Sequence, residues 1–120
     1  MSQKFQTIGQ ITKEDITKWK QTKSGLKRIE IPLDDEDLSG QGEKACFIIC
    51  KPTRNVLSAI TLYAKEQDIE KINDLLVKNC VLGGDMKYLD TEVGDTQVYT
   101  TVLEELGKLM EKKRVISKNL

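Results

Sequence analysis

The sequence predicts an α+β fold that is mostly helical, with four to five helices and a two-stranded antiparallel hairpin. Two short segments of strand length lie before residue 51, whereas apolar residues at helical spacing dominate after it. Only six of the 120 residues are aromatic, so the predicted core is largely aliphatic. Together these observations indicate a small helical domain built on a short sheet.

The chain has the length of a single domain, residues 1–120. We divide it into an N-terminal helical arm (1–25), an acidic loop (33–43), a strand plus helical core (44–112) and a tail (113–120). No apolar segment approaches the roughly 20 residues that span a bilayer, and the N-terminus lacks the apolar stretch of a signal peptide. We therefore expect a cytoplasmic protein without a membrane contact.

The first part of the chain predicts one short helix and the hairpin. Thr12 followed by Asp15 is typical of a helix N-terminus, and the helix is expected from about residue 13 to 21. Residues 26–31 partly alternate between polar and apolar, which predicts a half-buried strand that a proline ends. Residues 45–50 form an uninterrupted apolar segment of strand length. Joining the two strands through the acidic loop makes an antiparallel hairpin.

Two antiparallel helices are predicted next. Thr53 is a natural N-cap, and apolar residues from Val56 to Ala64 follow at helical spacing. The phase is lost at residues 66–68 and restarts at Ile69, so two helices joined by a tight turn are expected, with Asp68 capping the second. The residues expected to join this pair to the strand are Val56, Ile60, Tyr63, Ile72 and Leu76.

Glycines and aspartates mark the remaining boundaries. Gly83 and Gly84 are expected to stop the second helix, one of them in the left-handed conformation. Asp85 can then cap a short helical turn, and Asp95 or Thr96 starts the last helix. The apolar stripe of that helix comprises Val98, Val102, Leu103, Leu106, Leu109 and Met110.

The net charge is zero, but the charges lie in blocks. Residues 1–32 carry about +4, the acidic loop holds five acids and no base, residues 67–96 carry about −4, and the chain after Thr96 carries about +2. Such blocks permit head-to-tail attraction between copies or docking onto an oppositely charged partner, and they are also compatible with solvated faces alone. The balanced charge disfavours nucleic-acid binding, which normally requires a net basic face.

Residues suited to catalysis or to metal binding are scarce. The chain has no histidine, which removes the usual general base and the commonest metal ligand. Three cysteines, Cys46, Cys50 and Cys80, are expected to be buried free thiols. Cys46 and Cys50 would face the same side of a strand. A zinc site is disfavoured, because it normally shows closer cysteine pairs and a fourth ligand. The acids at 34–37 lack the spacing of a calcium loop. We expect no enzyme activity, no metal and no cofactor.

Three short motifs point to a family. They are Phe-Ile-Ile-Cys-Lys-Pro-Thr-Arg at residues 47–54, Lys-Asn-Cys-Val-Leu-Gly-Gly-Asp at 78–85, and Val-Tyr-Thr-Thr-Val-Leu at 98–103. Over about residues 45–112 the chain resembles tail assembly chaperones of tailed phages and prophages. The resemblance implies a non-catalytic protein of the bacterial host cytoplasm. Such chaperones bind the tape-measure protein, keep its helical apolar segments soluble, help bring tail-tube subunits to it, and leave before the virion is complete.

The last predicted helix carries more apolar positions than a two-stranded sheet needs, and this excess indicates a partner-binding surface. Binding to protein partners, or to other copies of this chain, is the expected use. A tail-completion or connector protein is the nearest alternative, followed by a nucleic-acid module using residues 13–28 and a thiol or zinc protein. The candidate interface residues are Leu106, Leu109, Met110, Val115 and Ile116.

Overall fold

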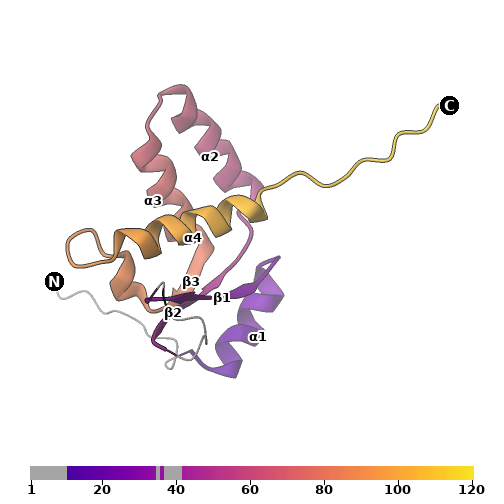
Figure 1. The fold of residues 1–120 in the computed structure, drawn as a ribbon. Coiled ribbons are helices and arrows are strands. Elements are labelled where there is room, and N and C mark those ends of the chain that lie inside the picture. The colour runs from indigo at the N-terminus through magenta and orange to yellow at the C-terminus, as the bar shows by residue number, and fades with distance from the viewer. Residues whose placement is uncertain (1–10, 35, 37–41) are drawn as a thin grey trace.

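A three-stranded antiparallel sheet forms the centre of the computed structural model, which describes residues 11–34, 36 and 42–120. The strand β2 (Lys44–Ile49) lies in the middle, between β1 (Lys27–Pro32) and β3 (Val81–Gly84) (Figure 1). The predicted β1–β2 hairpin is confirmed, but the prediction of only two strands is wrong. The third strand is the Gly-Gly segment that the sequence indicated as a helix stop.

The described residues form four α-helices and one short 3-10 helix, so the predicted α+β class is confirmed. The fifth helix that the sequence allowed is the 3-10 turn. None of these helices is long and apolar enough to cross a membrane. The helices are α1 (Lys13–Thr22), α2 (Arg54–Lys65), α3 (Ile69–Cys80), η2 (Met86–Leu89) and α4 (Thr96–Leu109). Residues 1–10 of the predicted arm and most of the predicted acidic loop lie outside the described residues.

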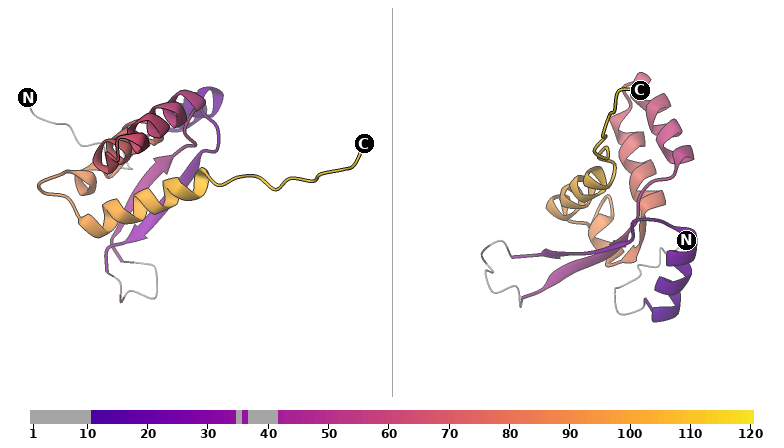
Figure 2. Two further views of the ribbon diagram at one scale, coloured as in Figure 1. Left: turned by 90° about the horizontal axis from the view of Figure 1, so that it is seen from above. Right: turned by 90° about the vertical axis from the view of Figure 1, so that its right-hand side faces the viewer.

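The helices occupy separate places around the sheet. In Figure 2, α4 lies along one face of the sheet, α1 lies beside the other, and the α2–α3 pair rises from one end. The strand register places Ile29 opposite Phe47 and Arg28 opposite Ile48. Because successive side chains of a strand point to opposite faces, Ile29 and Phe47 face α4, and Arg28 and Ile48 lie on the α1 side.

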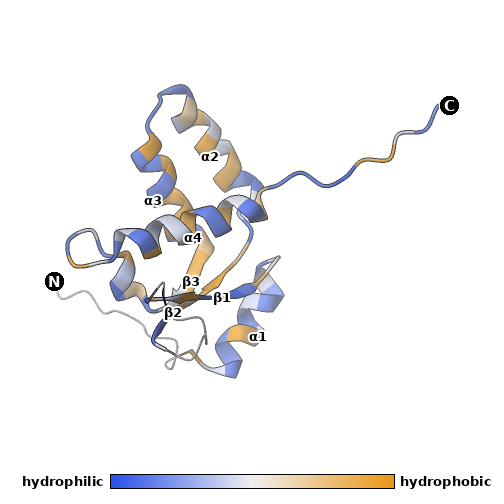
Figure 3. Ribbon diagram, in the orientation of Figure 1, coloured by the Kyte–Doolittle hydropathy of each residue, from blue (hydrophilic) through white to orange (hydrophobic). Residues whose placement is uncertain are grey.

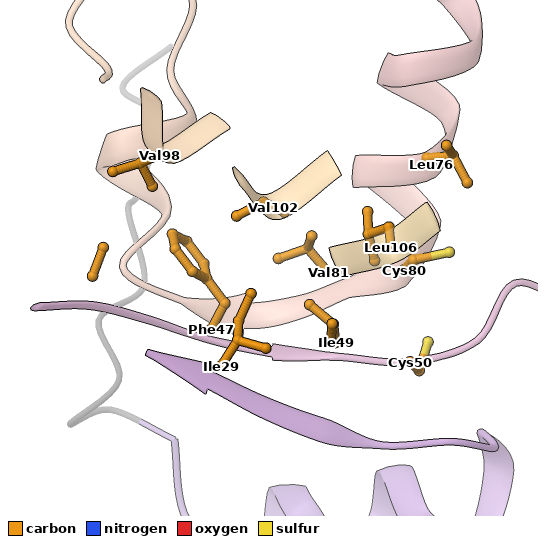
Figure 4. Packing of buried hydrophobic residues seen from close by; sticks show 11 residues of the cluster. Ile29, Phe47, Ile49, Cys50, Leu76, Cys80, Val81, Val98, Val102 and Leu106 are labelled. Carbon is orange, nitrogen blue, oxygen red and sulfur yellow. The ribbon is translucent and has the colours of Figure 1, made fainter. Parts of the chain in front are cut away.

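The core lies between β2 and α4. Every residue from Ala45 to Cys50 is buried, and Phe47 and Ile49 are completely inaccessible to solvent. Val98, Val102 and Leu106, spaced four residues apart on one face of α4, close over them (Figure 4). The predicted stripe of the last helix therefore covers the sheet.

Local sequence signals set the ends of the helices as expected. Thr12 and the third residue of α1 form a reciprocal capping box at 3.0 and 3.1 Å. The side chains of Thr53, Asp68 and Asp95 accept backbone hydrogen bonds at the starts of α2, α3 and α4. In the turn between α2 and α3, Gln67 has a left-handed φ of 58°.

Asp85 does not cap the 3-10 turn with its side chain, contrary to expectation. Its carboxylate Oδ2 instead accepts a hydrogen bond from the Cys46 backbone N–H at 2.9 Å. Its own N–H donates to the Cys46 carbonyl oxygen, also at 2.9 Å. Asp85 thus extends the pairing of β2 with β3 by two hydrogen bonds.

The α2–α3 pair is attached to the core mainly through α3. Of the five residues expected to join the pair to the strand, Leu76 is buried in the core cluster, and Ile60 and Ile72 pack against that cluster. Val56 and Tyr63 are only half-buried and lie outside it. The prediction was right for three of the five, because α2 packs mainly on α3 and only Ile60 of its stripe reaches the core cluster.

We predict that Gly84→Ala destabilises the fold by about 2–4 kcal/mol. Gly84 has a φ of +136°, and a Cβ there would overlap the Cys46 carbonyl oxygen and lie 2.7 Å from the Phe47 Cα. Gly107 is the matched control, because a Cβ added to this α4 residue meets nothing within 4 Å. Gly107→Ala should stabilise the protein by up to about 1 kcal/mol. Urea unfolding of both variants measures the difference; equal stabilities would contradict the assigned pairing of β3.

Candidate partner-binding surfaces

The five predicted interface residues are divided between the core and the surface. Leu106 is 0% exposed, so it belongs to the core and is not available to a partner. Leu109 and Met110 are partly buried and pack against the core. Val115 and Ile116 are 78% and 72% exposed. The expected excess of apolar positions on α4 is largely used in the core, where Val98, Val102 and Leu106 cover the sheet.

The C-terminal tail (residues 111–120) extends away from the rest of the protein. It begins just past α4, forms no helix or strand, and points into open space (Figure 1). Its charged side chains are one acid, Glu111, and four bases. The four bases are Lys112, Lys113, Arg114 and Lys118, and the exposed apolar residues of the tail are Val115, Ile116 and Leu120.

The α2–α3 hairpin exposes a second set of apolar side chains. No residue of α2 is buried, although its sequence carries an apolar stripe. Leu57 and Leu62 of α2 are 41% and 59% exposed, and Ile69 at the start of α3 is 68% exposed. Figure 3 shows apolar residues along this hairpin as well as at the sheet. Large exposed apolar side chains on a projecting element are typical of protein-binding sites.

A groove of about 750 Å³ lies between α3, the 90–95 segment and the start of α4. Its apolar lining comes from Ile69, Val77, Leu89 and Tyr99. We call it the acidic groove, because its charged lining residues are Glu70, Asp74, Asp90, Glu92 and Asp95, with Lys78 as the basic one. The sequence analysis did not identify it, although the acidic block at 67–96 contains all these carboxylates.

The surroundings shift the pKa of two groups in the groove. The Asp90 carboxylate accepts hydrogen bonds from the backbone N–H groups two and three residues further on, at 2.8 and 3.0 Å, and these lower its pKa. The pKa of Tyr99 is raised, first by burial and then by the carboxylates of Asp74 and Glu70. The lowered pKa of Asp90 favours its charged form, so this carboxylate adds to the negative charge of the groove at neutral pH.

The three cysteines are buried free thiols, as predicted, but they are not arranged as predicted. Cys50 and Cys80 pack together in the core (Figure 4), and the Cys50 N–H donates to the Cys80 carbonyl oxygen at 2.9 Å. Cys46 lies outside this cluster, because it faces the opposite side of β2 from Phe47 and Ile49, whereas Cys50 follows the end of the strand. Among the described residues, no group of three or more His, Cys, Asp or Glu side chains is placed to hold a metal ion.

Burial disfavours the thiolate form of the two core cysteines. It raises the pKa of Cys50, and it raises the pKa of Cys80 to about 11 with a further contribution from the neighbouring Cys50. A thiol with this pKa is almost fully protonated at neutral pH, whereas the nucleophile in cysteine chemistry is the thiolate. These two side chains are therefore suited to packing.

Comparison with protein-family models, with curated proteins and with solved structures gives no match to this chain. The surfaces described above are therefore the basis for a functional proposal. Each of them lies outside the core: the hairpin through α2, the acidic groove beside α3, and the C-terminal tail past α4.

We predict that the free energy of unfolding falls as the pH rises from about 9 to about 11. In this window the unfolded chain has released the Cys80 proton and the folded protein still holds it, so rising pH favours unfolding. This thiol contributes at most about 3 kcal/mol to the loss. Urea unfolding at several pH values should show a shallower decline for Cys80→Ala, and parallel declines would rule out this assignment.

Proposed function

We propose that this protein is a non-catalytic tail assembly chaperone of a tailed phage or prophage. In this proposal it acts in the cytoplasm of the bacterial host and binds the tape-measure and tail-tube proteins during tail morphogenesis. The observation that carries the proposal is the projecting α2–α3 hairpin, whose outer helix buries no residue and leaves Leu57 and Leu62 exposed. The motif resemblance over about residues 45–112 supports it.

The hairpin is well suited to receiving an apolar helix. The half-buried stripe of α2 packs on α3, with the Lys71 ammonium 5.6 Å from the centre of the Tyr63 ring, and the other side of α2 remains open to solvent. A partner helix with its own apolar stripe would cover Leu57 and Leu62 in the manner of helix-in-groove recognition. Because the hairpin contributes little to the core beyond α3, such binding requires no rearrangement of the sheet.

This function agrees with the division of the molecule into a buried sheet and exposed helices. A chaperone that leaves its client needs an interface of modest size, and such an interface can be formed by a few exposed apolar side chains on a stable support. The sheet and α4 provide the support through one shared core cluster. The hairpin, held at one end, provides the surface.

Co-expression with a helical segment of a phage tape-measure protein tests the proposal. The full chain should increase the soluble yield of that segment and co-purify with it. Leu57→Asp combined with Leu62→Asp should reduce the co-purified amount by about 30-fold or more, because two partly buried leucines and their packing are lost from the interface. Circular dichroism should show an unchanged helix content, since both side chains are exposed.

The matched control adds the same charge to another helix without removing apolar surface. Thr17→Asp combined with Gln21→Asp alters two exposed residues of α1, away from Leu57 and Leu62, and should leave co-purification within about twofold of the original chain. Equal losses in both double variants would contradict the apolar interface. Failure of the original chain to capture the segment, or its presence in purified mature phage particles, would contradict the chaperone function. The second result would instead favour a connector or tail-completion protein.

A further inference from the structure

We propose that the acidic groove of one copy binds the C-terminal tail of a second copy, so that copies associate head to tail. This interaction is independent of the proposed chaperone function and uses a different surface from Leu57 and Leu62. It joins two features of the described residues: a groove with an apolar and acidic lining, and an exposed tail with apolar and basic residues.

The two surfaces are complementary in apolar character. Ile69, Val77 and Leu89 contribute apolar lining to the groove, whose volume of about 750 Å³ lies in the usual range of binding sites. Val115 and Ile116 are adjacent in the tail and more than 70% exposed. Placing these two side chains in the groove would remove from water apolar surface that the monomer leaves exposed on both sides.

The two surfaces are also complementary in charge. Five carboxylates and one lysine line the groove, and the tail carries four bases and one acid. Charges of opposite sign at a partly enclosed site attract more strongly than in bulk water and guide the approach of the two chains. The triplet Lys112-Lys113-Arg114 stands directly before Val115, so charge and apolar surface can bind together.

The tail of another copy is the proposed occupant of the groove, because each tail leaves its own chain at the end of α4 that lies away from the groove. The groove lies at the start of α4 and the tail begins past its end, so the two are at opposite ends of the helix (Figures 1 and 2). Beyond α4 the tail extends away from the groove of its own chain, so in this structure the groove is open to the tail of a neighbour.

The form of the assembly follows from this geometry. Each copy offers one groove and one tail, which makes the interface heterologous. Such contacts produce rings where the rotation closes and open chains where it does not. Because the charged groups remain partly exposed, the association should weaken as salt is added.

Sedimentation velocity of the full chain, over a range of concentrations at low and high salt, tests the proposal. The original chain should associate at low salt and dissociate at high salt. Reversing the tail with Lys112→Glu, Lys113→Glu and Arg114→Glu should weaken association at least about tenfold. Reversing the groove with Glu70→Lys, Asp74→Lys and Glu92→Lys should do the same. These three acids are exposed and cap no helix, so the fold should be kept.

Combining all six substitutions in one chain supplies the decisive comparison. The combined variant restores opposite charges on groove and tail and has the same net charge as the original, so it should associate again. A control with Lys13→Glu, Lys18→Glu and Lys20→Glu in α1 has the same net charge as the tail variant and should still associate. A monomeric original chain at low salt, no recovery in the combined variant, or an equal loss in the α1 control would each overturn the proposal.

Discussion

The burial of residues 45–49 of β2 is the constraint on which the rest of the structure depends. These side chains are buried on both faces of the sheet, so the backbone groups of β2 need partners along both edges. β1 supplies one edge through the hairpin, and β3 supplies the other from much further along the chain. Gly84 allows the third strand to approach the Cys46–Phe47 backbone closely, and Asp85 completes the pairing with its carboxylate.

The third strand also determines which surfaces remain for binding. A three-stranded sheet presents a wider apolar face, and α4 covers it with Val98, Val102 and Leu106. The stripe of α4 is therefore mostly internal, while apolar side chains stay exposed on α2 and in the C-terminal tail. These surfaces lie on elements that contribute little to the core, so partners can bind there without disturbing the sheet.

The fold places the acidic and basic blocks of the sequence in two separate regions of the protein. The acidic block at 67–96 lies on α3, the 90–95 segment and the start of α4, which together enclose the acidic groove. The basic residues near the C-terminus are carried away from it along α4. In the proposed association the attraction between the two blocks acts from one copy to another, and the outer face of α2 stays available to a different partner.

The sequence alone determined the helix ends, the β1–β2 hairpin and the break between α2 and α3. Caps such as Thr53 and Asp68 and the period of apolar residues act over a few positions, so they can be identified without the rest of the fold. Only the tertiary structure decided that residues 81–84 form a strand, that Leu106 is buried while Val115 and Ile116 are exposed, and that an acidic groove exists. Strand pairing and burial depend on segments distant in the sequence, and the spacing of residues within one segment does not specify which other segment will cover it.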